Sequence, residues 1–213
     1  MTSVVREVES RVHVGFPGAW RWRAVFLVPN RYAVTIYTTA EANHYLFDGT
    51  TTAGFIGDRR VSAVVTPDDP VRTQARFVAV SLLDALRLPG VAVAETPSSA
   101  LAPGVAAELT AVFADDGSRY RLRLDEHGLV VGVEGPVVLE PVGRGRVVAT
   151  YDDFRRVGGR LFPYRTTWTL NGTLVAEDRT LRLCPDPAGL DTSAFATPAR
   201  LPECAPGEPP VGG

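Results

Sequence analysis

Three consecutive strands in the stretch 145–183 constrain the fold of this chain more than any other feature. Asn-Gly at positions 171–172 is the strongest short-range signal for a tight β-hairpin. A glycine pair at 158–159 allows a second tight connection just before it. The strand 160–170 alternates so that its large aromatic rings share one face. The meander therefore presents an apolar face that another layer has to cover.

The rest of the chain repeats this alternation of strand and turn. The segment 19–29 is the clearest amphipathic strand, because Trp20, Trp22 and Phe26 fall on one side and Arg21 and Arg23 on the other. Further strands are predicted at 1–14, 31–37, 44–47, 54–56, 108–113, 119–124 and 129–133, and a loop at 135–143. Strands at such short spacing are typical of a mainly β fold.

One segment breaks this rhythm and predicts a helix over about 70–88. Asp69 can cap its N-terminus, and Pro70 suits the first helical position. A lone helix among antiparallel strands must pack its apolar side on the sheet or cap the sheet's open end. Ordinary core packing is the simplest interpretation of such a helix. After it, the small and proline-rich segment 92–104 predicts a linker between two halves of the chain.

Composition excludes several classes of protein. With 213 residues and 45% hydrophobic content, the chain is not disordered as a whole. Its formal net charge of −2 argues against a broad nucleic-acid-binding surface. No run of about 20 apolar residues could cross a membrane. The first residues read as a strand and not as a signal peptide, so we expect either a cytoplasmic protein or one whose leader is missing from this sequence.

Two cysteines lie near the C-terminal end. Cys184 and Cys204 could form a disulfide that ties the tail to the last strand, which would indicate an oxidising compartment. Two free thiols are the other interpretation, and the sequence leaves both open. The segment 199–213 is rich in proline and small residues and is predicted to be a disordered tail.

No catalytic or metal-binding motif is present in the sequence. The histidines are isolated at His13, His44 and His127, and the aspartate pairs fall in or beside predicted turns. A hydrolase assembled from His44, Asp48 and a hydroxyl is therefore the least favoured interpretation. We expect a protein that is not an enzyme and that has no cofactor and no metal. What remains is an apolar interior that either holds a ligand or is simply a core.

At this point several segments resemble a known family. In order they are "PNRYAVTIY", "YLFDG", "SLLDALRLPG", "LRLDEHGLVVGVE", "YDDFRRVGGRLFPYRTTWTLNG" and "LDTSAFATP". Together they resemble the LolA/LolB-type outer-membrane lipoprotein carriers and their lipid-binding and sensor relatives. The resemblance covers a single domain over 14–198. It implies a strongly curved antiparallel β-sheet, an incomplete barrel, wrapped around a helical plug.

The resemblance also implies a site and a role. Acyl chains would bind between sheet and helix. Candidate wall residues are Trp20, Trp22, Phe26, Tyr32, Val34, Ile36, Phe47 and Phe55. Candidate plug residues on the helix are Phe77, Leu82, Leu83 and Leu86.

The implied function is binding, and transport, of lipid or of the acyl chains of a lipoprotein. The family places such proteins in the periplasm or at the outer membrane, with the export signal absent from this sequence. The alternative is a periplasmic sensor or scaffold module that acts through an envelope protein partner. Neither function involves nucleic acid.

Overall fold

The computed structural model describes residues 3–27, 30–38, 41–62, 69–96, 101–139, 142–198 and 204. Within them, one sheet of 13 strands accounts for almost all regular structure, and every strand pair is antiparallel. The first six strands are β1 (Ser3–Val12), β2 (Gly18–Leu27), β3 (Arg31–Tyr37), β4 (Ala42–Phe47), β5 (Thr52–Ile56) and β6 (Arg59–Ser62). The other seven are β7 (Val91–Glu95), β8 (Ala107–Phe113), β9 (Arg119–Leu124), β10 (Val130–Leu139), β11 (Gly143–Val157), β12 (Arg160–Leu170) and β13 (Thr173–Pro185).

The strand order joins the two ends of the chain at the middle of the sheet. The order is β6-β5-β4-β3-β2-β1-β13-β12-β11-β10-β9-β8-β7. Each half is therefore a simple meander, and β1 pairs with β13 to unite them. We call this pair the seam. It is the one pairing in the sheet between segments that are remote in sequence, and the interior it creates is built from both halves.

Helix α1 (Pro70–Ser81) begins as the sequence predicts. The Asp69 carboxylate accepts hydrogen bonds from the backbone N–H groups of Val71 (2.9 Å) and Arg72 (3.0 Å), and Pro70 occupies the first turn. Thr52 on β5 donates to the same carboxylate at 2.9 Å, which ties the cap to the sheet.

The predicted end of the helix at residue 88 is wrong. The α-helix stops at Ser81, because Leu83 takes a left-handed backbone conformation with φ of 63°. A short 3-10 helix, η1 (Asp84–Arg87), follows.

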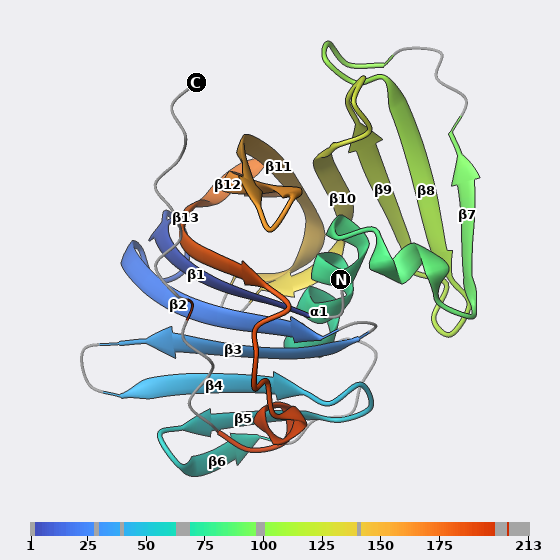
Figure 1. Ribbon diagram of the computed structural model, residues 1–213. Coiled ribbons are helices and arrows are strands. Elements are labelled where there is room, and N and C mark those ends of the chain that lie inside the picture. The colour runs from blue at the N-terminus through green and yellow to red at the C-terminus, as the bar shows by residue number, and fades with distance from the viewer. Residues whose placement is uncertain are drawn as a thin grey trace.

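Helix α1 packs on one face of the sheet and touches strands of both halves. It contacts β2, β3 and β4 on one side of the seam and β9 and β10 on the other. The backbone N–H of Val138 on β10 donates to the Thr73 hydroxyl at 3.1 Å. Figure 1 shows the helix between the blue strands of the first half and the β7–β10 strands of the second.

The structure confirms a mainly β fold with one antiparallel sheet and one α-helix in the described residues. The sheet is open, as expected for an incomplete barrel, but it is not strongly curled, so the expected strong curvature is wrong. Its edge strands β6 and β7 are short and do not pair with each other. Closure would require those two strands to meet, and the chain between them instead forms α1 and η1.

Two segments predicted as connections are strands. Residues 92–95 of the expected linker belong to β7, the edge strand. The expected loop 135–143 contains the second half of β10 and the start of β11. Gly135 is there for packing, since a Cβ at this position would lie 2.2 Å from the Tyr120 ring.

The opposite face of the sheet carries a second, smaller core. The 3-10 helix η2 (Thr192–Phe195) contacts β3 and β4, and it buries Phe195 against Val25, Ala33 and Leu46. Figure 1 shows this red turn beside the strands of the first half. Cys204 belongs to the same cluster and is joined to Cys184 by a disulfide, which answers the question that the sequence left open.

Other expectations stay as predictions. Apart from Cys204, the predicted tail 199–213 lies outside the described residues, and the domain limits 14–198 are untested, although β1 already begins at Ser3. Within the described ranges, no helix is long and apolar enough to span a membrane.

The second core predicts a contrast between two phenylalanines. We expect Phe195→Ala, which opens a cavity at a side chain only 1% exposed, to lower the free energy of unfolding by about 3 to 5 kcal/mol. Phe16→Ala, at a side chain 63% exposed, is the matched control and should change it by less than about 0.5 kcal/mol. Urea unfolding measures both. Equal effects would mean that η2 does not contribute to the folded core.

Candidate functional site

A pocket of about 630 Å³ lies where α1 meets the sheet, and we call it the main pocket. Its lining comes from β1 to β4, from α1 and its C-terminal turn, and from β10 to β13. Most of these side chains are aliphatic or aromatic. A concave, mostly apolar site of this size, with a few polar groups, is typical of a small-molecule binding site.

Most of the predicted wall and plug residues line this pocket. Those that do are Trp22, Phe26, Tyr32, Val34, Ile36, Phe77, Leu82 and Leu83. Trp20, Phe47, Phe55 and Leu86 do not. Leu86 packs against the edge of the same core without reaching the pocket.

The other three misplaced residues have separate reasons. Phe55 lies on the far face, where it packs against the second core. Phe47 lines a smaller pocket of about 260 Å³ on another side of α1. Trp20 lies near the start of β2, and its indole N–H donates to the Phe16 carbonyl at 3.0 Å. Phe55 differs from the lining residues in the face it occupies, which strand register decides, whereas Trp20 and Phe47 share the pocket face and differ in their position along the strand.

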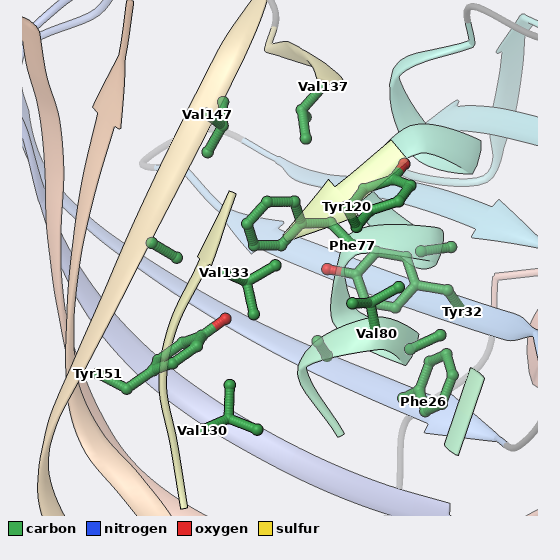
Figure 2. Packing of buried hydrophobic residues seen from close by; sticks show 14 of the residues in the cluster. Phe26, Tyr32, Phe77, Val80, Tyr120, Val130, Val133, Val137, Val147 and Tyr151 are labelled. Atoms are coloured by element: carbon green, nitrogen blue, oxygen red, sulfur yellow. The ribbon is translucent and has the colours of Figure 1, made fainter. Parts of the chain in front are cut away.

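Phe77 is the centre of the interior. Its ring lies 5.5 Å from the Trp168 ring and 6.1 Å from that of Tyr120, measured between centroids. Figure 2 shows Phe77 projecting from α1 among side chains of several strands, including Val133 and Val147. Since Phe77 is only 1% exposed, this part of the helix is fixed by packing, and the pocket lies around it.

A polar patch interrupts the apolar lining at the seam. It consists of Arg6 and Ser10 on β1 and Asp178 on β13, all of which line the main pocket. Ser10 and Asp178 are direct cross-strand partners. Buried charges are rare in apolar interiors because their desolvation is costly, so this polar patch is the most informative feature of the pocket.

Two threonines hold the Arg6 guanidinium. Its Nε donates to the Thr180 hydroxyl at 2.7 Å, and Nη2 donates to the Thr166 hydroxyl at 3.2 Å. Both threonines are buried. Burial lowers the pKa of Arg6, while the charge of Asp178 acts in the opposite direction. Even so, the guanidinium stays charged at any physiological pH.

The Asp178 carboxylate is satisfied by neutral donors. The Trp168 indole N–H donates to it at 2.8 Å, and the Ser10 hydroxyl also hydrogen-bonds to it. Arg6 attracts Asp178 through space, but the two make no direct ion pair within the described residues. Burial raises the pKa of Asp178, and this effect exceeds the lowering by Arg6, Ser10 and Trp168.

Two tyrosines face the same region. In Figure 2 the hydroxyl ends of Tyr32 and Tyr151 point into the space between helix and strands. Burial raises the pKa of Tyr151 to about 12, and it raises the pKa of Tyr32 further. Both phenols therefore stay neutral and can donate hydrogen bonds inside the pocket.

No described histidine lines the pocket. His44 lies 3.0 Å from the Thr35 hydroxyl and His13 lies 2.9 Å from Glu177, while His127 is in an exposed turn. Asp48, which a hydrolase built on His44 would need beside that histidine, accepts hydrogen bonds from the backbone N–H groups of Thr50 and Thr51 in its own turn. In the described part of the chain, no group of three or more His, Cys, Asp or Glu side chains could hold a metal ion.

The raised pKa of Asp178 predicts a pH effect on stability. A folded-state pKa above the unfolded value means that the folded state binds the proton more tightly. The contribution of Asp178 to the free energy of unfolding should therefore fall as pH rises from about 4 through the raised pKa. We expect the stability of the wild type relative to Asp178→Asn to decrease over this range in urea unfolding experiments.

Asp152→Asn, at an exposed carboxyl on β11, is the control for removing an acid at the surface. A wild-type advantage over Asp178→Asn that grows as pH rises would contradict the prediction and would mean that the folded protein favours the Asp178 anion.

Comparisons with known proteins support the fold and not a specific activity. No protein-family model matches the sequence, and a search of curated proteins also finds no match. Solved structures do match. A candidate outer membrane lipoprotein-sorting protein domain from Vibrio parahaemolyticus gives a TM-score of 0.62 at 11% identity, covering 91% of this chain and 89% of that one.

Two further structures match over the same shares of both chains. A LolA superfamily protein from Nitrosomonas europaea gives a TM-score of 0.61 at 11% identity. A DUF1329 family protein from Desulfovibrio piger gives 0.59 at 10% identity. The predicted resemblance to the LolA superfamily is thereby confirmed for the fold of this chain.

Proposed function

We propose that this protein binds lipid, or the acyl chains of a lipoprotein, in the main pocket and that it does so without catalysis. The observation that carries the proposal is the pocket itself. About 630 Å³ of space remains between α1 and the sheet, lined mostly by apolar side chains from both halves of the chain. Protein interiors are normally close-packed, so a space of this size favours a ligand over an ordinary core.

The binding energy would come from burying hydrocarbon. Each buried methylene contributes about 0.8 kcal/mol, so a long acyl chain supplies several kcal/mol. Helix α1 would act as the plug of the expected carrier. Release would then require α1 to approach the sheet or an acceptor with higher affinity to take the ligand, which is the basis of the proposed transport.

The mouth of the main pocket is marked by lining residues that are exposed to solvent. These are Leu83, Arg87, Arg160 and Leu161. Leu83 is 36% and Leu161 38% exposed. Exposed apolar side chains beside an apolar pocket give an acyl chain a path from solvent or membrane.

We place the protein in the periplasm or at the outer membrane, because a disulfide is typical of an oxidising compartment and the fold is that of the LolA superfamily.

A protein-binding sensor or scaffold is the second candidate. The observation that favours it is edge strand β7, whose residues from Ala92 to Glu95 are exposed and which has a strand neighbour on one side only. An open edge can accept a strand from an envelope protein partner. Capture of such a partner by protein stripped of lipid would support this function.

We predict that filling the pocket weakens ligand binding. Ala176 lines the main pocket from β13, opposite Trp168. We expect Ala176→Phe to weaken binding of a brominated fatty acid by about tenfold or more, or roughly 1.4 kcal/mol. Quenching of Trp22 and Trp168, which both line the pocket, measures the affinity, and native mass spectrometry measures the stoichiometry.

Ala94→Phe is the matched control, because Ala94 is exposed on β7 and does not line the pocket. Its affinity should equal that of the wild type. If delipidated wild type binds no fatty acid, or if Ala176→Phe binds it as well as the control does, the lipid-binding function is wrong and the protein-binding candidate takes its place.

A further inference from the structure

The Arg6 guanidinium has hydrogen-bonding capacity that the protein leaves unused. Its bonds to Thr180 and Thr166 occupy two of its five N–H donors. Nη1 makes no hydrogen bond to any described residue. No fully buried side-chain nitrogen or oxygen in the described residues lacks a partner, so Nη1 must be accessible. Since Arg6 lines the main pocket, that accessible edge faces the pocket.

The free edge has the geometry that a carboxylate requires. Nη1 and Nη2 each retain at least one N–H, and these two nitrogens form the fork that binds a carboxylate in bidentate fashion. The threonine hydroxyls fix the rest of the guanidinium, so little conformational entropy remains to be lost on binding. An apolar pocket built only for hydrocarbon would not need a charged group held in this way.

We propose, on the basis of the lipid-binding function above, that the ligand is a long-chain amphiphile with a carboxylate head group, which binds head-first and pairs with Arg6 at the seam. The hydrocarbon chain then lies along the apolar lining, between Phe77 and the strands, toward the mouth. The neutral phenol of Tyr32 can donate a further hydrogen bond to the head group.

Asp178 sets the charge of the ligand. One guanidinium faces one carboxyl across the seam, and that carboxyl already has Trp168 and Ser10 as donors. The polar patch therefore offers one guanidinium beside one carboxyl, which favours a head group with a single negative charge. A dianionic phosphate would place two charges against the same arginine and beside Asp178, so the polar patch favours a carboxylate over a phosphate.

The opposite orientation is the rival arrangement. Arg87 and Arg160 at the mouth could hold an anionic head group in solvent while the chain enters first. Exposed arginines are ordinary in water and contribute little when paired there. A guanidinium inside an apolar pocket has a desolvation cost that only an internal partner offsets, and for this reason the head-first orientation is favoured.

The test compares three ligands with the same hydrocarbon chain. Palmitate, hexadecanol and hexadecyl phosphate displace a brominated long-chain alcohol from delipidated full-length protein near pH 8, with recovery of Trp22 and Trp168 fluorescence as the readout. We expect palmitate to bind at least about tenfold more tightly than hexadecanol, and more tightly than hexadecyl phosphate. Arg6→Met should lose this preference and still bind hexadecanol, whereas Arg119→Met, at an exposed arginine of β9 outside the pocket lining, should keep it.

Each other outcome is decisive. Equal binding of palmitate and hexadecanol by the wild type overturns the head-first inference and leaves the lipid-binding function intact. Tighter binding of the phosphate overturns the choice of carboxylate. Loss of the preference in Arg160→Met but not in Arg6→Met indicates the opposite orientation. Binding of no ligand at all overturns the lipid-binding function itself, and the inference with it.

A second measurement needs no variant and so does not depend on Arg6→Met folding. Palmitate labelled with carbon-13 at its carboxyl and at its terminal methyl is bound to the wild-type protein, and a soluble gadolinium chelate is added. A head group at Arg6 should be protected from paramagnetic broadening, while the terminal methyl of the chain should be broadened. A carboxyl signal that broadens like that of the free ligand would overturn the head-first orientation.

Discussion

The pairing of β1 with β13 is the constraint on which the rest of the structure depends. It unites two meanders that are otherwise built from neighbouring strands, and it brings residues of the N-terminal strand beside residues near position 180. Because this pairing is non-local, its loop-closure entropy has to be offset by contacts along the whole seam. The nine cross-strand partners from Val4–Pro185 to Val12–Ala176 provide those contacts. Without them, neither the main pocket nor the polar patch would exist.

The seam explains why the charged residues of the pocket are where they are. The middle of a sheet is its most constrained part, since each strand is held on both sides. Arg6 reaches across β13 to Thr180 and to Thr166 on β12, so its guanidinium position is set by three strands at once. A binding group needs such support to stay in position. At an edge strand, the same arginine would extend into water and contribute little.

The sequence predicts local structure well and long-range placement poorly. The hairpin at Asn171-Gly172 and the Asp69 cap depend on neighbouring residues, and the structure confirms both of them. The role of Arg6 depends on strands 160 or more residues away, since its contacts with Thr166 and Thr180 span 160 and 174 positions. The alternation in 160–170 already puts Phe162 and Trp168 on one face. The sequence could therefore have predicted that these two pocket-lining residues of the second half lie on the same side of the sheet. Phe55 was misplaced because strand register, and not residue type, decides which face a ring occupies.

The two faces of the sheet differ in how completely they are packed. A pocket of about 630 Å³ forgoes the packing contacts that a filled core would provide, and the buried charges at its seam add a desolvation cost. The far face contains the opposite arrangement, in which η2 covers Val25, Ala33 and Leu46 with the fully buried ring of Phe195 and the Cys184–Cys204 disulfide closes the cluster. Side chains alternate along each strand, so in β1 to β4 the residues that pack the second core are sequence neighbours of residues that line the pocket. Packing on the far face therefore also fixes the position of the pocket-lining residues. Rigidity supplied from the far face therefore allows the near face to remain unfilled and charged, which is the state that a binding site requires.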